Sequence, residues 1–129
     1  MGLANKLRLC SALFLIMPLG LFVGIHIFTD SWFVEEATEA HFQDGKTLAN
    51  IVIFQGVGIS IIMLISSFIK DISSAKIVLL GVSILTLMVL ATFIANQVIF
   101  DASPPIPIWV ILGLAFLISI YGRFKVNRM

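Results

Sequence analysis

Four long apolar stretches alternate with short polar segments along the chain, and this pattern decides the predicted fold class. The apolar stretches cover residues 9–28, 48–69, 77–100 and 106–121. About 20 residues of helix, rising about 1.5 Å each, cross the roughly 30 Å hydrocarbon core of a bilayer. The fourth stretch is short, but Arg123 and Lys125 after it can extend their charged ends outward. Because lipid offers no partner to backbone N–H and C=O groups, each stretch must be helical.

Composition agrees with this interpretation. The chain has 129 residues, of which 60% are apolar and 12% charged. A soluble domain of this size cannot bury so much apolar surface. The net charge of +1 creates no strong field for nucleic acid. We therefore predict an all-α fold, a single four-helix transmembrane domain spanning residues 1–129, with the lipid bilayer as its surroundings.

The basic residues predict the orientation of this bundle. All but one of the eight Lys and Arg residues fall at segments that would share one side: Lys6, Arg8, Lys70, Lys76, Arg123, Lys125 and Arg128. Lys46 is the exception, and most acidic residues lie with it on the opposite side. By the positive-inside rule, the basic side is cytoplasmic. We expect a multi-pass protein of the cytoplasmic (inner) membrane with both termini in the cytoplasm.

The outer polar segment, residues 29–47, lies between the first two stretches and is acidic. Its spacing of apolar and polar residues predicts a short amphipathic helix on the outer membrane surface, ending near Gly45. Glu35, Glu39 and His41 are weak candidates for a metal site, since carboxylates and imidazole bind divalent ions. No second cluster of ligands supports them, so we predict a solvated acidic face and no metal or other cofactor.

Small residues predict where helices pack. Gly20 and Gly24 form a Gly-x-x-x-Gly spacing, which lets a neighbouring helix approach, either within the bundle or in a homodimer. In the second stretch a seam of 3.5-residue period contains Gly56 and Ser60. Its other members are Ala49, Ile53, Met63 and Ser67. We expect this face at the bundle centre.

Neutral polar side chains gather towards the predicted outer half of the membrane. They are His26 in the first stretch, Asn50 and Gln55 in the second, and Asn96 and Gln97 in the third. No Asp, Glu, Lys or Arg lies within a predicted span, which argues against a coupled transporter. Two interpretations remain. These groups either join helices by hydrogen bonds worth about 0.6–2 kcal/mol each, or line a pocket for a lipid, a quinone or another small polar ligand.

The layout resembles the uncharacterised small four-helix inner-membrane proteins of bacteria, broadly DoxX-like in arrangement. The shared features are an acidic segment after the first helix, a basic turn at residues 70–76 and a polar end to the third helix before Asp101. Relatives in that group often carry an arginine after the acidic residue and another in the third helix. This chain has neither and offers Asn96 instead, so the resemblance implies a layout and transfers no functional residue.

Two classes of function fit these observations. The first is a non-enzymatic accessory or structural subunit that packs against other membrane proteins or forms a homo-oligomer. The second is a lipid-, quinone- or small-molecule-binding protein, or a minor transporter or channel, that uses the outer polar residues. Neither His26 nor His41 has a paired nucleophile or a metal cluster in the sequence, so we predict no catalytic residue and no enzyme.

Overall fold

The computed structural model describes residues 1–28, 36–100 and 104–128 of the chain. Its four helices are α1 (Leu3–Ile27), α2 (Glu39–Ser66), α3 (Ile72–Phe100) and α4 (Ile106–Lys125). All four are long and apolar enough to cross a membrane. The prediction of four apolar spanning helices is therefore confirmed, and the chain has the features of a multi-pass membrane protein.

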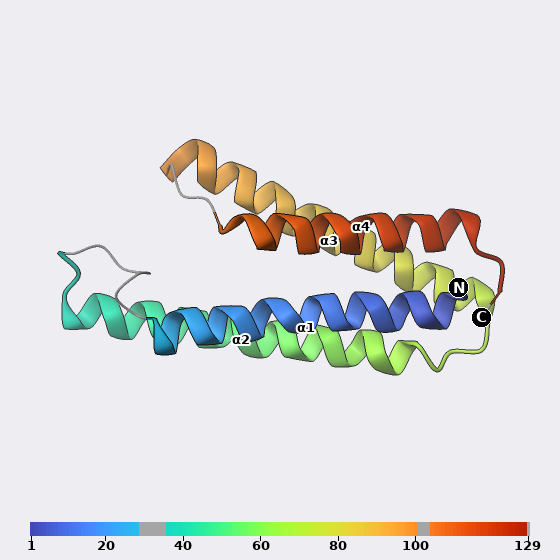
Figure 1. Cartoon of the computed structure of the whole chain (residues 1–129), viewed down its shortest axis with the longest axis horizontal. Helices are drawn as coiled ribbons and strands as arrows, with labels where there is room; N and C mark the ends of the chain where they lie inside the picture. The colour runs from blue at the N-terminus through green and yellow to red at the C-terminus, as the bar shows by residue number, and fades with distance from the viewer. Residues whose placement is uncertain (29–35, 101–103, 129) are drawn as a thin grey trace.

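The helices pack as two hairpins, α1 with α2 and α3 with α4 (Figure 1). The hairpins join mainly through α1 and α4, whereas α2 and α3 make the least extensive contact of the packed pairs. Both termini lie at the same end of the bundle (Figure 1). There the backbone N–H of Leu3 donates to the carbonyl of Arg128 at 2.9 Å. The side of the bundle between α2 and α3 is consequently its most open side.

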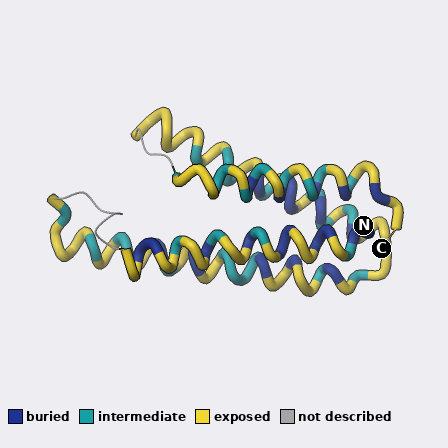
Figure 2. The backbone as a smooth tube through the Cα atoms, viewed as in Figure 1, coloured by how far each residue is buried: buried dark blue, intermediate teal, exposed yellow. Residues whose placement is uncertain are grey.

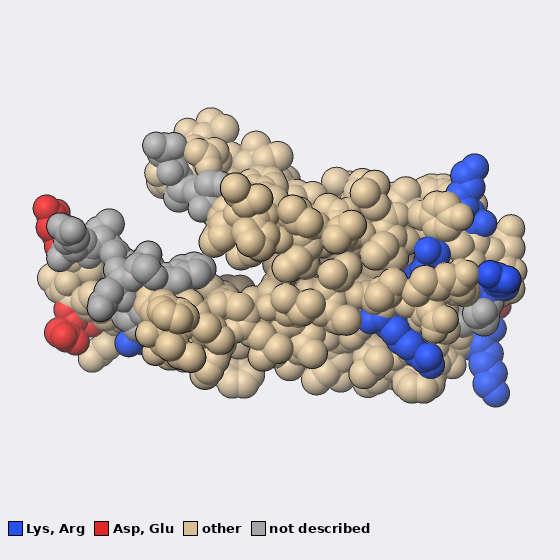
Figure 3. All heavy atoms as spheres, viewed as in Figure 1, with Lys and Arg blue, Asp and Glu red and all other residues tan. Residues whose placement is uncertain are grey.

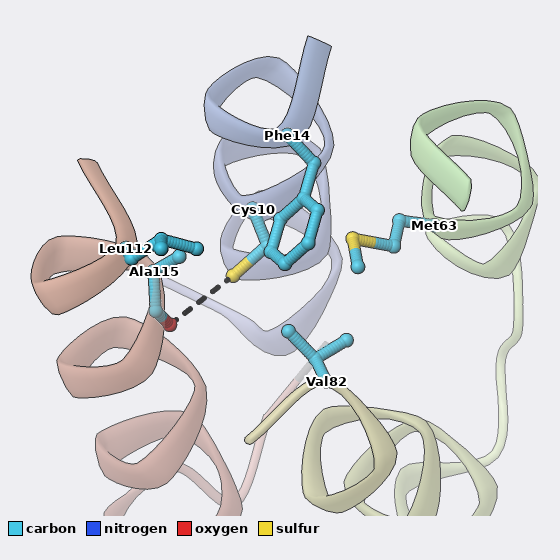
Figure 4. Packing of buried hydrophobic residues seen from close by; sticks show 6 residues of the cluster. All are labelled: Cys10, Phe14, Met63, Val82, Leu112 and Ala115. Carbon is cyan, nitrogen blue, oxygen red and sulfur yellow. Dashed lines mark hydrogen bonds between the residues drawn. The ribbon is translucent and has the colours of Figure 1, made fainter. Parts of the chain in front are cut away.

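A cluster of buried side chains from all four helices forms the central core (Figure 4). It comprises Cys10, Phe14, Met63, Val82, Leu112 and Ala115. A second cluster, near the termini, contains Leu3, Leu7, Ala75, Leu79 and Val126. Most other large apolar side chains face outward, as Figure 2 shows along every helix. Such an apolar exterior is favourable in a lipid environment.

Buried serines join the two helices of each hairpin. The hydroxyl of Ser11 donates to the carbonyl of Ser60 at 2.8 Å, and that of Ser60 donates to the carbonyl of Ser11 at 2.9 Å. In the other hairpin the hydroxyls of Ser83 and Ser119 lie 2.8 Å apart. Small polar residues of this kind let helix backbones approach and satisfy their own hydroxyls across the contact.

The start of α2 differs from the sequence expectation. Residues 39–47 continue the spanning helix instead of forming a separate amphipathic helix on the surface, and Gly45 lies inside α2 and does not end a helix. The Thr38 hydroxyl accepts from the His41 N–H at 3.4 Å, and the Thr38 N–H donates to His41 Nδ1 at 3.2 Å. This reciprocal cap places the helix start at Glu39. The first part of the predicted amphipathic segment, residues 29–35, lies outside the described residues.

Other helix ends also extend beyond the uncharged stretches. α1 begins at Leu3, before Lys6 and Arg8, and α3 begins at Ile72. α4 runs on to Lys125. The sequence stretches were bounded by charges, but a charged residue does not end a helix once its side chain reaches water. At the turn between α2 and α3 the opposite holds, because α2 ends at Ser66, three residues before the last apolar residue of its stretch.

Charge is separated along the molecule. Lys and Arg side chains gather at the end where the termini lie, and Asp and Glu side chains are prominent at the far end (Figure 3). We call these the basic end and the acidic end. A multi-pass protein with this separation has a strong orientation preference.

Candidate functional site

The feature that stands out as a candidate site is a cleft of about 480 Å³ between the two hairpins. Its walls come from the middle of α1, α2 and α3, from the start of α4 and from the two prolines before α4, and the hollow between the hairpins is visible in Figure 3. The lining is Phe14, Met17, Pro18, Leu21, Val52, Gln55, Gly56, Ile59, Leu85, Val89, Phe93, Pro104, Pro105 and Ile108. Ligand-binding pockets are typically about 300–1,000 Å³, so this volume suits a small molecule or part of a lipid.

The core cluster closes the inner end of the cleft. Phe14 belongs to both, and Met17, Val89 and Phe93 pack against the cluster while lining the cleft. Pro18 of α1 lines the cleft and faces α2. A Cβ added at Gly56 would lie 3.1 Å from Cγ of Pro18, so the proline ring approaches the α2 backbone closely there. The absence of a side chain on Gly56 thus lets α1 and α2 stay in contact beside the cleft.

Towards the acidic end α3 leans away from α1 and α2, whereas α4 runs nearly alongside α1 (Figure 1). α2 and α3, which bound the open side of the cleft, pack little against each other.

Gln55 is the one residue with a polar side chain among those that line the cleft. A primary amide offers a carbonyl acceptor and two N–H donors. The described lining contains no Asp, Glu, Lys, Arg, His or Cys. The cleft therefore provides shape, apolar contact and one hydrogen-bonding group, which suits binding of an uncharged amphiphile.

The other predicted pocket residues are arranged differently from the expected common pocket. His26 Nε2 lies 2.8 Å from Asn50 Oδ1, which joins α1 to α2, and the His26 ring lies 4.8 Å from that of Phe22. Neither His26 nor Asn50 lines the cleft. Asn96 and Gln97 are exposed on the part of α3 that leans away. The structure thus joins His26 with Asn50, places Gln55 in the cleft, and leaves the two α3 residues apart from both.

The weak metal candidates do not converge in the described part of the chain. No group of three or more His, Cys, Asp or Glu side chains that could hold a metal ion occurs among the described residues. His41 uses Nδ1 in the α2 cap, and Glu39 is the exposed first residue of that helix. Glu35 lies outside the described residues.

The predicted packing residues have unequal environments. Ser60 is buried against Ser11, Gly24 is buried in α1, and Gly56 faces Pro18. Gly20 is exposed, and a Cβ added there would meet nothing within 4 Å. Most of the predicted seam is buried: Gly56 is partly buried, and the buried members are Ala49, Ile53, Ser60, Met63 and Ser67, the last just past the end of α2.

Sequence reasoning missed the apolar walls of the cleft. Phe14, Val89 and Phe93 look like any other lipid-facing or core residue, because hydropathy gives membrane helices little contrast between the two. The available signal was Pro18, whose position opposite the small residue Gly56 marks a close approach of α1 and α2. That signal predicts a packed contact but not the opening beside it.

Comparison of the chain with protein-family models, curated proteins and solved structures finds no match. The residues of the cleft themselves are therefore the basis for a functional proposal.

Proposed function

We propose that this chain is a binding protein, not an enzyme, that holds the apolar part of an uncharged amphiphile, such as a lipid chain or a quinone, in its cleft. The observation that carries the proposal is an apolar cleft of about 480 Å³ in which Gln55 supplies the one polar side chain. We infer that the opening of the cleft between α2 and α3 faces lipid in the membrane. The proposal corresponds to the ligand-binding class expected from the sequence, but with an apolar cleft in place of the polar pocket.

The cleft supports this proposal on energetic grounds. Its lining is almost wholly apolar, so a ligand with a charged group inside it would lose hydration without compensation. A carbonyl or hydroxyl on the ligand can bond to Gln55, and such a bond contributes about 0.5–1.5 kcal/mol. Most of the affinity would then come from shape and dispersion contacts with the aromatic and branched side chains.

We also propose that the protein lies in a bacterial-type cytoplasmic membrane with both termini in the cytoplasm. The separation of basic and acidic ends supports this orientation (Figure 3). Fusions of a cytoplasm-dependent fluorescent reporter to either terminus test it. Fluorescence from both fusions is expected, and activity of a periplasm-dependent reporter at either terminus would contradict the orientation.

The ligand proposal is tested by blocking the cleft. Val52 lines the cleft and is 55% exposed, whereas Ile61 on the same helix is 50% exposed and does not line it. Val52→Trp should displace a bound molecule from the purified protein, and Ile61→Trp should leave it in place. Extraction in mild detergent, native mass spectrometry and analysis of organic extracts measure the bound molecule.

A wild-type protein that carries no lipid or quinone beyond random detergent-exchangeable lipid would overturn the proposal. Equal occupancy in both tryptophan variants would also overturn it. A stoichiometric protein partner released by Val52→Trp would favour the accessory-subunit prediction instead, with a helix of that partner in the cleft. Gln55→Leu should weaken a ligand carrying a carbonyl or hydroxyl by about two- to tenfold and leave a pure hydrocarbon chain bound.

A further inference from the structure

Lys6, in the first turn of α1, is a buried cation at the basic end of the bundle. The residue is 8% exposed, and a Cβ added at Gly122 of α4 would lie 2.9 Å from its Cδ. The hydrocarbon part of Lys6 is thus packed between α1 and α4. Its ammonium lies 4.6 Å from the centre of the Tyr121 ring. Since Tyr121 is 56% exposed, the charged tip of Lys6 lies at the rim of the α1–α4 contact.

The described residues supply no anion for this ammonium. Asp71 is the one described acid in the segments at the basic end, and its carboxylate accepts from the Ser74 N–H at 2.7 Å at the start of α3. The Tyr121 ring offers Lys6 a cation–π contact, which does not neutralise the charge. A largely buried cation without a counter-charge is costly, so an external anion would stabilise this arrangement.

Two further features add positive potential at the basic end of the bundle. Arg123 follows Gly122 on α4, and its Nε is buried without a hydrogen-bond partner. α1 begins at Leu3 with Gly2 as its N-cap, no side-chain cap and no acid in the first turn. The positive end of the α1 dipole, at which no acidic side chain lies, therefore adds to the positive potential near Lys6.

We propose that the α1–α4 rim formed by Lys6 and Tyr121 binds the phosphate of an anionic phospholipid headgroup. The basic end lies where the helices leave the hydrocarbon, at the depth of lipid phosphates. The Lys6 ammonium donates to the phosphate oxygens, and the exposed Tyr121 ring covers the upper part of a lipid chain. This site is separate from the cleft, which lies nearer the acidic end, and does not depend on the proposed ligand there.

The test uses the purified full-length chain in a neutral detergent, titrated with short-chain phosphatidylglycerol, phosphatidylcholine or inorganic phosphate. Native mass spectrometry counts bound lipids, and thermal unfolding measures stabilisation. Lys6→Met removes the charge while keeping an apolar stem of similar length. Lys46→Met removes the one Lys or Arg at the opposite end as a matched control.

Wild-type protein should bind phosphatidylglycerol in preference to phosphatidylcholine, and Lys6→Met should weaken that binding by about fivefold, since one lysine near a membrane surface contributes about 1 kcal/mol. Lys46→Met should bind as wild type does. Equal binding of both lipids by wild type overturns the site, and this comparison needs no variant to fold. If Lys6→Met and Lys46→Met weaken phosphatidylglycerol binding equally, the binding depends on net charge alone, and this result also overturns the site. Displacement of the lipid by equimolar inorganic phosphate would overturn the lipid assignment in favour of a free phosphate site.

Discussion

At the scale of single residues, the glycines of this chain serve different purposes that their spacing alone does not distinguish. Gly20 and Gly24 share a helix-packing spacing, yet Gly20 is exposed and Gly24 is buried. Gly56 faces the ring of Pro18, and a Cβ on Gly122 would lie 2.8 Å from Cδ1 of Leu79. The cost of adding a side chain therefore depends on the helix opposite.

A leucine at Gly56 should destabilise the bundle, whereas a leucine at Gly20 should not. At Gly56 even a Cβ would meet the Pro18 ring at 3.1 Å, and a proline ring inside a helix cannot move aside by changing rotamer. Overpacking of this kind typically costs about 1–3 kcal/mol. Reversible unfolding in mixed detergent micelles measures the difference. Equal stability of the two variants would show that α1 and α2 are not closely apposed at Pro18.

At the scale of secondary-structure elements, the sequence predicted the presence and type of all four helices but not their ends. Uncharged length detects a spanning helix because the bilayer imposes it. Helix ends instead depend on caps such as Thr38 with His41, which lie outside the apolar stretches. The seam of Ala49, Ile53 and Ser60 was readable because small residues at a 3.5-residue period mark a packed face.

The cap of α2 gives a prediction at this scale. Thr38→Ala removes the hydroxyl that accepts from His41 N–H, and loss of such a cap typically costs about 0.5–2 kcal/mol. The first turn of α2 should open more often, with faster amide exchange near residues 39–42 and no change near residues 53–60. Thr47→Ala is the matched control, because the Thr47 hydroxyl donates to Gln43 within the same helix. Equal effects of the two substitutions would contradict the cap.

The start of α3 depends on pH through Asp71. Hydrogen bonds from Ser74, together with the backbone N–H of Ser73, hold the pKa of the Asp71 carboxyl below its ordinary value of 3.8. A lowered pKa means that the contribution of Asp71 is present above pH 3.8 and is lost as pH falls through the lowered value. The protection of the Ser74 amide, measured by hydrogen exchange relative to the intrinsic rate at the same pH, should therefore fall in wild type under strongly acidic conditions. In Asp71→Ala the Ser74 amide should exchange fast at neutral pH as well, and an unchanged rate there would contradict the assignment.

At the scale of the whole molecule, the arrangement of the helix pairs determines the candidate site. The predicted polar pocket required α1, α2 and α3 to converge near the acidic end. His26 and Asn50 do meet, but α3 leans away and carries Asn96 and Gln97 with it. A single sequence does not encode such a tilt in its polar pattern, because tilt follows from packing between helices. The resulting opening leaves an apolar cleft in place of a polar one.

An open side between α2 and α3 implies that bilayer lipid reaches the cleft wall. Tryptophan placed at Val89, which lines the cleft, should be quenched by lipids brominated on their chains nearly as strongly as tryptophan at Ile94, which is 55% exposed on the same helix. Both substitutions are made with Trp32 and Trp109 replaced by Phe, so that one fluorophore reports. Bromine near the chain ends and near the headgroup separates the depths of the two positions.

Strong quenching at Ile94 with none at Val89 would mean that the hairpins close over the cleft, or that a tightly held molecule fills it. A second substitution, Val52→Leu, distinguishes these cases and, unlike Val52→Trp, introduces no second fluorophore. If it displaces a bound molecule, quenching at Val89 is restored. If the bundle is closed, quenching at Val89 stays absent.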